Sequence, residues 1–414
     1  MQLSVEPLAG PVDEAPRVVV EDVRPGRDVL LTIQTTDANG NRWRSRTELS
    51  GAAGTAESTG LADPSQPWWR MEFASEGVAP VAFAAPPDAL AYDVTVESGS
   101  ERLALTVSRQ WCSQVERRAV SGEGYQLTSF TPLVGPGPWP GVVVVPGSTG
   151  AAAVEPMAAL LASHGCAAAV LAYAGEPGLP PTVEAIPIEA LAEGVRAFAA
   201  MPPVDGARLA VIASSAGTGG ALSALATFED LAPRCVVAIA PTSVVWQALG
   251  SGGPPPRASS WALGGEPLPW VPVHGEPSAQ VIEHKLLERF PHHPTPRALH
   301  MHEAFAKGLS DEGAVAAAAI PVERIDAPLL LLTGEDDRLW PSASMARAIL
   351  ARRRRDDDRH LTYPAAGHFL RPPITPTTVP WTDTYVSGGE PAGNAAAQAQ
   401  GWIAIRSFFD THLA

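Results

Sequence analysis

The spacing of hydrophobic residues divides the chain into two parts. Up to about residue 118, short apolar runs alternate with polar positions, and turn residues such as Pro25 and Gly26 separate them. The strand-like runs cover residues 18–20, 29–33, 92–96 and 103–107. Several short alternating strands with turns between them predict a small β-sandwich over residues 1–118.

From about residue 125 the apolar runs become continuous, as in strands that are buried on both faces. These runs cover residues 141–145, 167–172, 209–213, 235–240 and 329–332, and a shorter strand follows at residues 360–363. Segments of helical character lie between them, at residues 151–164 and 188–200. Strands that alternate with helices predict an α/β domain over residues 119–414, with a mainly parallel sheet and helices on both faces.

The alternation breaks between about residues 247 and 320. This segment is rich in Pro, Gly, Trp and His, and residues 278–289 have the pattern of a helix. An insertion at this point of such a fold would lie over the strand ends. We therefore expect residues 247–320 to form a lid.

Composition and charge narrow the function classes. The chain has 414 residues, 45% of them hydrophobic and 18% charged, which is enough apolar material for sizeable cores. Its net charge of −15 argues against nucleic acid or an anionic membrane as a partner, because the long-range field would repel both. The sequence shows neither a signal-peptide pattern at its start nor a run of about 20 apolar residues. We expect a cytoplasmic protein without a membrane span.

Metal or cofactor chemistry has little support in the sequence. Cys112, Cys166 and Cys235 are far apart and follow neither a disulfide nor a zinc-ligand spacing. The histidine pairs lack a carboxylate or cysteine to complete a set of ligands; they are His292, His293, His300 and His302. We therefore expect no metal and no bound cofactor.

Ser215 carries the strongest chemical signal. It lies in the segment Ala213-Ser214-Ser215-Ala216-Gly217, directly after a buried strand. Small-x-Ser-x-Gly is the pattern of a nucleophile elbow, here with Ala213 in place of the first glycine. A serine on a sharp strand-to-helix turn needs small neighbours, because the chain segments cross closely there. This motif alone leaves open a glycine-rich helix start with an ordinary serine.

Two later segments supply partners for that serine. The strand at residues 329–332 is followed by Gly334-x-x-Asp337, where an α/β-hydrolase presents its acid; Asp337 fits the spacing and Asp336 competes. His368 follows a glycine shortly after the last predicted strand. Serine, acid and histidine follow one another in the order that the α/β-hydrolase fold requires. We predict Ser215 as nucleophile, His368 as base and Asp337 as the acid that orients it.

A tetrahedral intermediate also needs preorganised donors for its oxyanion. The backbone N–H of Ala216, directly after the nucleophile, is expected to be one of them. The loop at residues 146–150 is expected to supply the other, with Ser148 as the first choice and Gly147 as the second.

With these motifs the sequence resembles the acyl-CoA thioesterase family that includes bile acid-CoA:amino acid N-acyltransferase. The resemblance is carried by residues 334–337 with Trp340, and by residues 363–373, 388–391 and 408–413. It implies an immunoglobulin-like domain followed by an α/β-hydrolase domain, and activity on fatty acyl-CoA by hydrolysis or by transfer to glycine or taurine. Ala213 and Ala216 stand where the family usually has a glycine and a bulkier or basic residue.

Serine rather than cysteine at the elbow favours water as the acceptor, because an acyl-serine oxoester is less prone to aminolysis than a thioester. The predicted function is a serine-dependent hydrolase of acyl-CoA or of another carrier-bound acyl thioester. An acyltransferase or cyclase of secondary metabolism with the same triad stays open, as do a carboxylesterase and a non-catalytic binding protein on this scaffold. The oligomeric state stays open as well.

Two further features have a structural and a functional interpretation. Residues 352–355 are consecutive arginines followed by consecutive aspartates, which favours a solvated, self-compensating helix end over a site for the phosphates of coenzyme A. Four tryptophans either line an apolar acyl pocket or simply pack in the core. They are Trp246, Trp261, Trp270 and Trp340.

Overall fold

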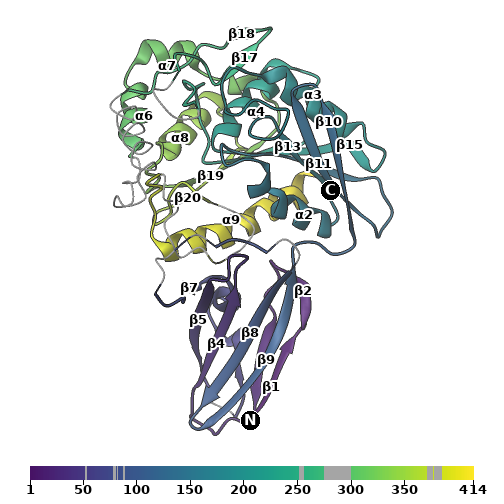
Figure 1. The fold of residues 1–414 in the computed structure, drawn as a ribbon, viewed down its shortest axis with the longest axis vertical. Coiled ribbons are helices and arrows are strands. Elements are labelled where there is room, and N and C mark those ends of the chain that lie inside the picture. Colours follow the sequence, from purple (N-terminus) through teal and green to yellow (C-terminus); the bar gives the residue numbers. More distant parts are fainter. Residues whose placement is uncertain are drawn as a thin grey trace. The chain divides into compact units, whose positions relative to one another are not determined.

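The computed structural model describes residues 1–51, 54–77, 81, 83–86, 89–250, 256–274, 300–370, 376 and 385–414. The chain forms two compact units (Figure 1). Met1–Ser113 and Glu390–Trp402 belong to the first, while Gln114–Leu370 and Ile403–Ala414 belong to the second, together with residues 385–389.

The first unit is built from two sheets. One has the order β1 (Gln2–Glu6), β3 (Arg17–Glu21) and β6 (Ala56–Glu57). The other has the order β2 (Ala9–Pro11), β9 (Glu101–Gln110), β8 (Ala89–Ser98), β4 (Val29–Thr36), β5 (Arg42–Leu49) and β7 (Glu72–Phe73). Two short helices, η1 (Ser58–Gly60) and α1 (Gln66–Trp69), lie between β6 and β7. Every second residue of β4 is buried, so the alternating sequence gives the sheet one apolar face.

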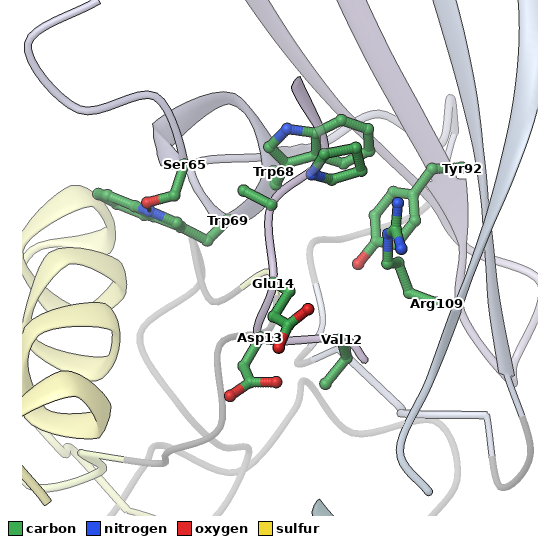
Figure 2. Close-up of a pocket in the computed structure, with 10 residues that line it drawn as sticks. Val12, Asp13, Glu14, Ser65, Trp68, Trp69, Tyr92 and Arg109 are labelled. Carbon is green, nitrogen blue, oxygen red and sulfur yellow. Dashed lines mark hydrogen bonds between the residues drawn. The ribbon is translucent and has the colours of Figure 1, made fainter. Parts of the chain in front are cut away.

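A hollow in this unit is too small to be a substrate site (Figure 2). Its volume is about 10 Å³, which is the room taken by one water molecule. Arg109 and Tyr92 are both buried at its wall. Burial lowers the pKa of the Arg109 guanidinium and raises the pKa of the Tyr92 phenol.

The second unit contains an eight-stranded sheet. Its strand order is β10 (Val115–Gly122), β11 (Tyr125–Pro132), β13 (Ala167–Ala172), β12 (Trp139–Val145), β15 (Val204–Ser214), β16 (Cys235–Ile239), β19 (Leu329–Gly334) and β20 (Arg359–Tyr363). From β13 to β20 all neighbours are parallel, and the β10–β11 hairpin joins the edge antiparallel. The hairpin strand β10 begins at Val115 and so crosses the division predicted at residue 118.

Helices accompany this sheet. They are α2 (Glu155–Ser163), α3 (Ile188–Ala199), α4 (Ala216–Thr227) and α8 (Ser342–Arg353), with the short helices η2 (Ala151–Ala153) and η3 (Val322–Arg324). The long helix α9 (Pro391–His412) belongs to the first unit up to Trp402 and to the second unit from Ile403. The apolar core between sheet and helices includes Val143, Val211, Leu222 and Leu331. The α/β class predicted for this part is therefore confirmed, with predicted and observed strand ends agreeing within a residue at residues 235–240.

The predicted lid region holds two helices and two strands, and these strands form a small sheet with a strand from residues 186–187. The sheet has the order β14 (Ile186–Pro187), β17 (Trp261–Leu263) and β18 (Glu266–Pro267), and the helices are α6 (His302–Leu309) and α7 (Glu312–Ala318). The helix predicted at residues 278–289 lies outside the described residues. In the part of the chain that the structure describes, no helix is both long and apolar enough to cross a bilayer.

Candidate active site

Ser215 lies on a strained turn between β15 and α4. Its φ of 50° and ψ of −127° put a non-glycine residue in the left-handed half of the Ramachandran map. The turn is held from both sides: Ser215 N donates to Ile239 O at 2.9 Å, and Thr218 Oγ1 donates to Ser215 O at 2.7 Å. A strained residue that its surroundings hold in place, as they hold Ser215, is typical of functional sites.

The small residues around the elbow make room for particular neighbours. A Cβ on Gly217 would lie 2.2 Å from the carbonyl oxygen of Pro146, so only glycine fits there. A Cβ on Gly220 would lie 2.4 Å from Cη2 of Trp261, which packs on α4 from β17. The glycines near the start of α4 thus make room for this tryptophan.

The acid loop after β19 buries Asp337 and satisfies its carboxylate with donors. Oδ1 accepts from the N–H groups of Leu339 and Trp340 at 3.0 and 3.1 Å. Oδ2 accepts from the Ser342 hydroxyl at 2.5 Å and faces Nδ1 of His368 at 2.9 Å. The residue is 4% exposed, so its charge is held by these groups rather than by solvent.

Asp336, the competing acid, points elsewhere. Its carboxylate pairs with Arg338 at 2.8 Å and accepts the N–H of Gly389 at 2.9 Å. Partial burial would raise the pKa of Asp336, but the hydrogen bonds from Arg338 and Gly389 outweigh it and lower that pKa. Asp337 is therefore the acid that reaches the histidine.

His368 joins the other two residues. Its Nε2 lies 2.8 Å from Ser215 Oγ, and its Nδ1 lies 2.9 Å from Asp337 Oδ2. An ionised carboxylate can only accept, so Nδ1 must carry the proton. Nε2 of the neutral ring is then the acceptor for the serine hydroxyl, which is the arrangement of a general base.

Two backbone positions that were expected to supply oxyanion donors, Ala216 and Gly147, lie next to the nucleophile. Ala216 is the first residue of α4, and the first N–H groups of a helix have no partner within it. In the loop after β12, Gly147 contacts the serine: a Cβ there would lie 3.0 Å from Ser215 Cβ. The Tyr173 hydroxyl holds this loop by donating to Pro146 O at 2.9 Å. Ser148 as the second donor stays a prediction.

The sequence motifs did not reveal that residues 387–389 connect the acid loop with the histidine loop. The carbonyl of Ser387 accepts from Arg338 N at 3.2 Å and from His368 N at 2.9 Å. Gly388 pairs with Asp337 in a β-bridge and has a φ of 77°, and a Cβ on it would lie 1.8 Å from Asp336 O. The glycines at residues 388–389 were noted only for their family resemblance.

An aromatic series leads away from the imidazole. The Trp340 ring lies 5.5 Å from that of His368, Phe305 lies 5.7 Å from Trp340, and Trp246 lies 4.8 Å from Phe305, all edge to face. They form one buried cluster with residues of the lid region, including Val271. Trp261 and Trp270 pack instead in or against the main core.

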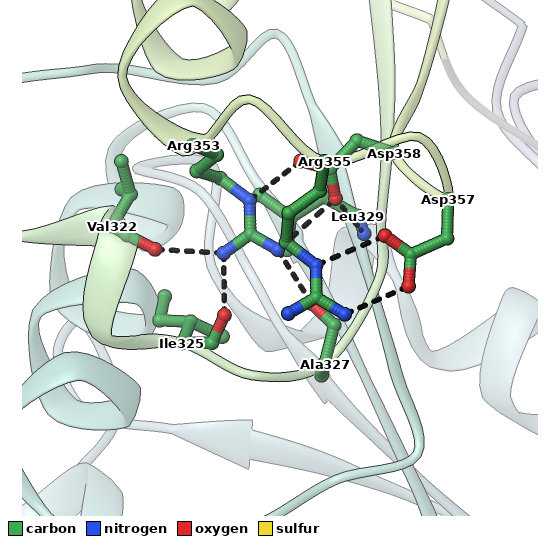
Figure 3. Close-up of polar contacts among 8 residues, drawn as sticks. All are labelled: Val322, Ile325, Ala327, Leu329, Arg353, Arg355, Asp357 and Asp358. Carbon is green, nitrogen blue, oxygen red and sulfur yellow. Dashed lines mark hydrogen bonds and ion pairs between the residues drawn. The ribbon is translucent and has the colours of Figure 1, made fainter.

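In the run of arginines at residues 352–355, Arg353 is buried and holds neighbouring segments together (Figure 3). Its side chain is 0% exposed and pairs with Asp358, which is 1% exposed, at 2.7 Å. The remaining N–H groups donate to the carbonyl oxygens of Val322, Ile325 and Ala327. The solvated interpretation is therefore wrong for Arg353, while the exposed Arg355 does pair with Asp357.

The structure also bears on the histidine pairs and on the cysteines. His292 and His293 lie outside the described residues, and within the described ones no three His, Cys, Asp or Glu side chains gather as a metal site. Burial raises the pKa of Cys166 to about 11 and that of Cys235 to about 12, which suits neither for nucleophilic chemistry near neutral pH.

Comparison with known proteins finds similarity to the family that the sequence resembles. Residues 270–414 match the family described as "BAAT / Acyl-CoA thioester hydrolase C terminal". "Acyl-coenzyme A thioesterase 2, mitochondrial" of Mus musculus is 28% identical, over 99% of this chain and 89% of its own length. "Acyl-coenzyme A thioesterase 5" of Mus musculus is 26% identical, over 97% and 94%. "Acyl-coenzyme A amino acid N-acyltransferase 1" of Mus musculus is 28% identical, over 67% and 61%.

Proposed function

We propose that this chain, a relative of the acyl-CoA thioesterases and the acyl-CoA amino acid N-acyltransferases, is a serine-dependent hydrolase of acyl thioesters. The observation that carries the proposal is the hydrogen-bonded series from Ser215 through His368 to Asp337. The strained turn under the serine and the proton on Nδ1 of the imidazole are what a nucleophile and its base require.

The first half-reaction forms an acyl-enzyme. His368 Nε2 takes the hydroxyl proton as Ser215 Oγ bonds to the thioester carbonyl carbon. The oxyanion is met by the Ala216 N–H and a donor of the loop at residues 146–150, with Ser148 or Gly147 as the residue. The intermediate then expels the thiolate, which takes the proton from the imidazolium, and the acyl group stays on the serine as an oxoester.

The second half-reaction uses water. His368 removes a proton from the water as its oxygen attacks the ester carbonyl, and collapse of the intermediate returns that proton to Ser215. The products are a carboxylic acid, a free thiol and the starting enzyme. Asp337 stays ionised throughout and stabilises the imidazolium in both halves.

The aromatic series beside the histidine supports an apolar acyl group. Trp340, Phe305 and Trp246 are all buried, and they extend from the imidazole edge into the lid region. Apolar and aromatic surroundings with few polar groups are those that an acyl chain requires. The similarity to an N-acyltransferase keeps transfer to an amine as the second candidate function.

Release of free thiol from a panel of acyl-CoAs tests the proposal, with Ser215→Ala as the control. We expect thiol release that depends on Ser215, and a carboxylic acid as the product by mass spectrometry. Added glycine or taurine should leave that product unchanged. An amide product would establish the acyltransferase instead, and an enzyme active on oxoesters but on no thioester would contradict the proposal.

A further inference from the structure

One hydroxyl contacts the catalytic carboxylate from outside the three predicted residues. Ser342 is the first residue of α8, and its Oγ donates to Asp337 Oδ2 at 2.5 Å. This is the same oxygen that faces His368 Nδ1 at 2.9 Å. Ser342 is 0% exposed, so water cannot take the place of its hydroxyl without rearrangement.

The chemistry fixes the direction of this hydrogen bond. An ionised carboxylate has no proton to give, so the Ser342 hydroxyl is the donor. A short O–H···O⁻ contact is of the strong, charge-assisted kind. The serine therefore withdraws electron density from the oxygen that holds the imidazole, and it limits the directions in which that oxygen can turn.

We propose that Ser342 is a positioning residue, which orients Asp337 Oδ2 toward His368 and sets how strongly the carboxylate holds the imidazolium. This inference rests on the proposed function of Ser215, His368 and Asp337. Without the hydroxyl the carboxylate carries more of its charge toward the ring. The imidazolium then keeps its proton to higher pH, and less of the free base is present at neutral pH.

Four ionisable groups of the acid loop and of α8 form ion pairs with each other. Asp336 pairs with Arg338, and Glu335 pairs with Arg347 of α8. Among the described residues of the second unit, neighbouring elements also carry His302 at the start of α6 and Tyr385 in the segment before Ser387. A change at Ser342 alters none of these groups directly, so its effect on the pH profile can be assigned to the Asp337–His368 pair.

Helix α8 offers a matched control. Ser344 lies two residues further along, is exposed, and donates to the Pro341 carbonyl at 2.9 Å. Ser344→Ala removes the same atoms from the same helix turn without touching the carboxylate. A loss that comes only from replacing a serine in this helix turn would affect both variants alike, whereas a packing defect at the buried Ser342 would lower the unfolding temperature without moving the pH profile.

The test measures the rate at which a fluorophosphonate labels Ser215 as a function of pH, in the wild type, Ser342→Ala, Ser342→Cys and Ser344→Ala. For Ser342→Ala we expect an acid limb moved about one pH unit upward, which makes labelling roughly 10-fold slower at any pH on that limb. Ser342→Cys keeps the volume with a weaker donor and should fall between, while Ser344→Ala should match the wild type. Thermal unfolding of each variant separates loss of fold from loss of reactivity.

An unmoved acid limb in folded Ser342→Ala would overturn the inference, as would an equal change in Ser344→Ala. The labelling reaction needs no acyl substrate, so the two proposals fail in different ways. A wild type that is labelled at Ser215 but hydrolyses no thioester contradicts the proposed function and leaves the effect of Ser342 measurable. A wild type that is not labelled overturns both.

Discussion

Replacing Arg353 by methionine should be among the most destabilising single changes in the second unit. A guanidinium has five N–H groups, and at Arg353 Asp358 and the carbonyl oxygens of Val322, Ile325 and Ala327 accept all of them. Removing one partner of a buried ion pair leaves an uncompensated charge and costs about 3–5 kcal/mol. Arg353→Met should lower the free energy of unfolding by that amount.

The same run of arginines supplies the control. Arg355 pairs with Asp357, but their side chains are 36% and 44% exposed. Solvent screens such a pair, which contributes about 0–1 kcal/mol. Arg355→Met should therefore change stability little, although it removes the same charge two residues away.

Urea unfolding followed by tryptophan fluorescence distinguishes the two. We expect the midpoint of the second unit's transition to fall strongly for Arg353→Met and hardly at all for Arg355→Met, with an unchanged slope for both. Equal midpoints for the two variants would refute the assignment of Arg353 to the core. So would a KM for acyl-CoA that rises in Arg353→Met while the KM for dephospho-CoA esters does not, because that result belongs to a phosphate site.

Two further predictions concern the site and a third concerns a buried thiol. Asp337→Asn should lower kcat by about 10⁴-fold because the imidazole loses its tautomer, whereas Asp336→Asn should cost less than about 10-fold; equal losses would contradict the assignment of the acid. Gly388→Ala places a Cβ 1.8 Å from a backbone oxygen and should lower kcat roughly 100-fold in a folded protein, while Gly175→Ala, at a similar φ with nothing nearby, should keep activity. The pKa of Cys166 is raised to about 11, so the thiolate is scarce at neutral pH; alkylation by iodoacetamide should accelerate up to about that pH, and a plateau below pH 9 would contradict the burial argument.

Local patterns in the sequence were enough for the elements and for the three central side chains. The continuous apolar runs that became β12, β15 and β19 had to be buried on both faces, and a parallel sheet buries them. Ser215 and Asp337 each follow such a strand, and His368 follows the more exposed strand β20, so one edge of the sheet gathers all three. The order of these residues along the chain, serine, acid and histidine, then indicated the role of each.

Contacts that depend on backbone atoms or on tertiary packing could not be predicted from such local patterns. Ser387 accepts its hydrogen bonds through its backbone carbonyl oxygen. Every residue type has that atom, so the sequence gives no signal for the contact with Arg338, which lies far away along the chain. Ser342 looks like an ordinary helix start until its hydroxyl is seen to reach Asp337. Arg353 is indistinguishable from Arg355 in the sequence, and only tertiary packing buries one of them.

The central claim is that an acyl group passes through Ser215, and mass spectrometry of the enzyme tests it most directly. The protein is mixed with an acyl-CoA, quenched in acid within the first turnover and digested, and the peptides are searched for the acyl mass. We predict that mass on the peptide that contains Ser215, and its disappearance in Ser215→Ala. An acyl group on Cys166 or Cys235, or thiol release that persists in Ser215→Ala, would contradict the account.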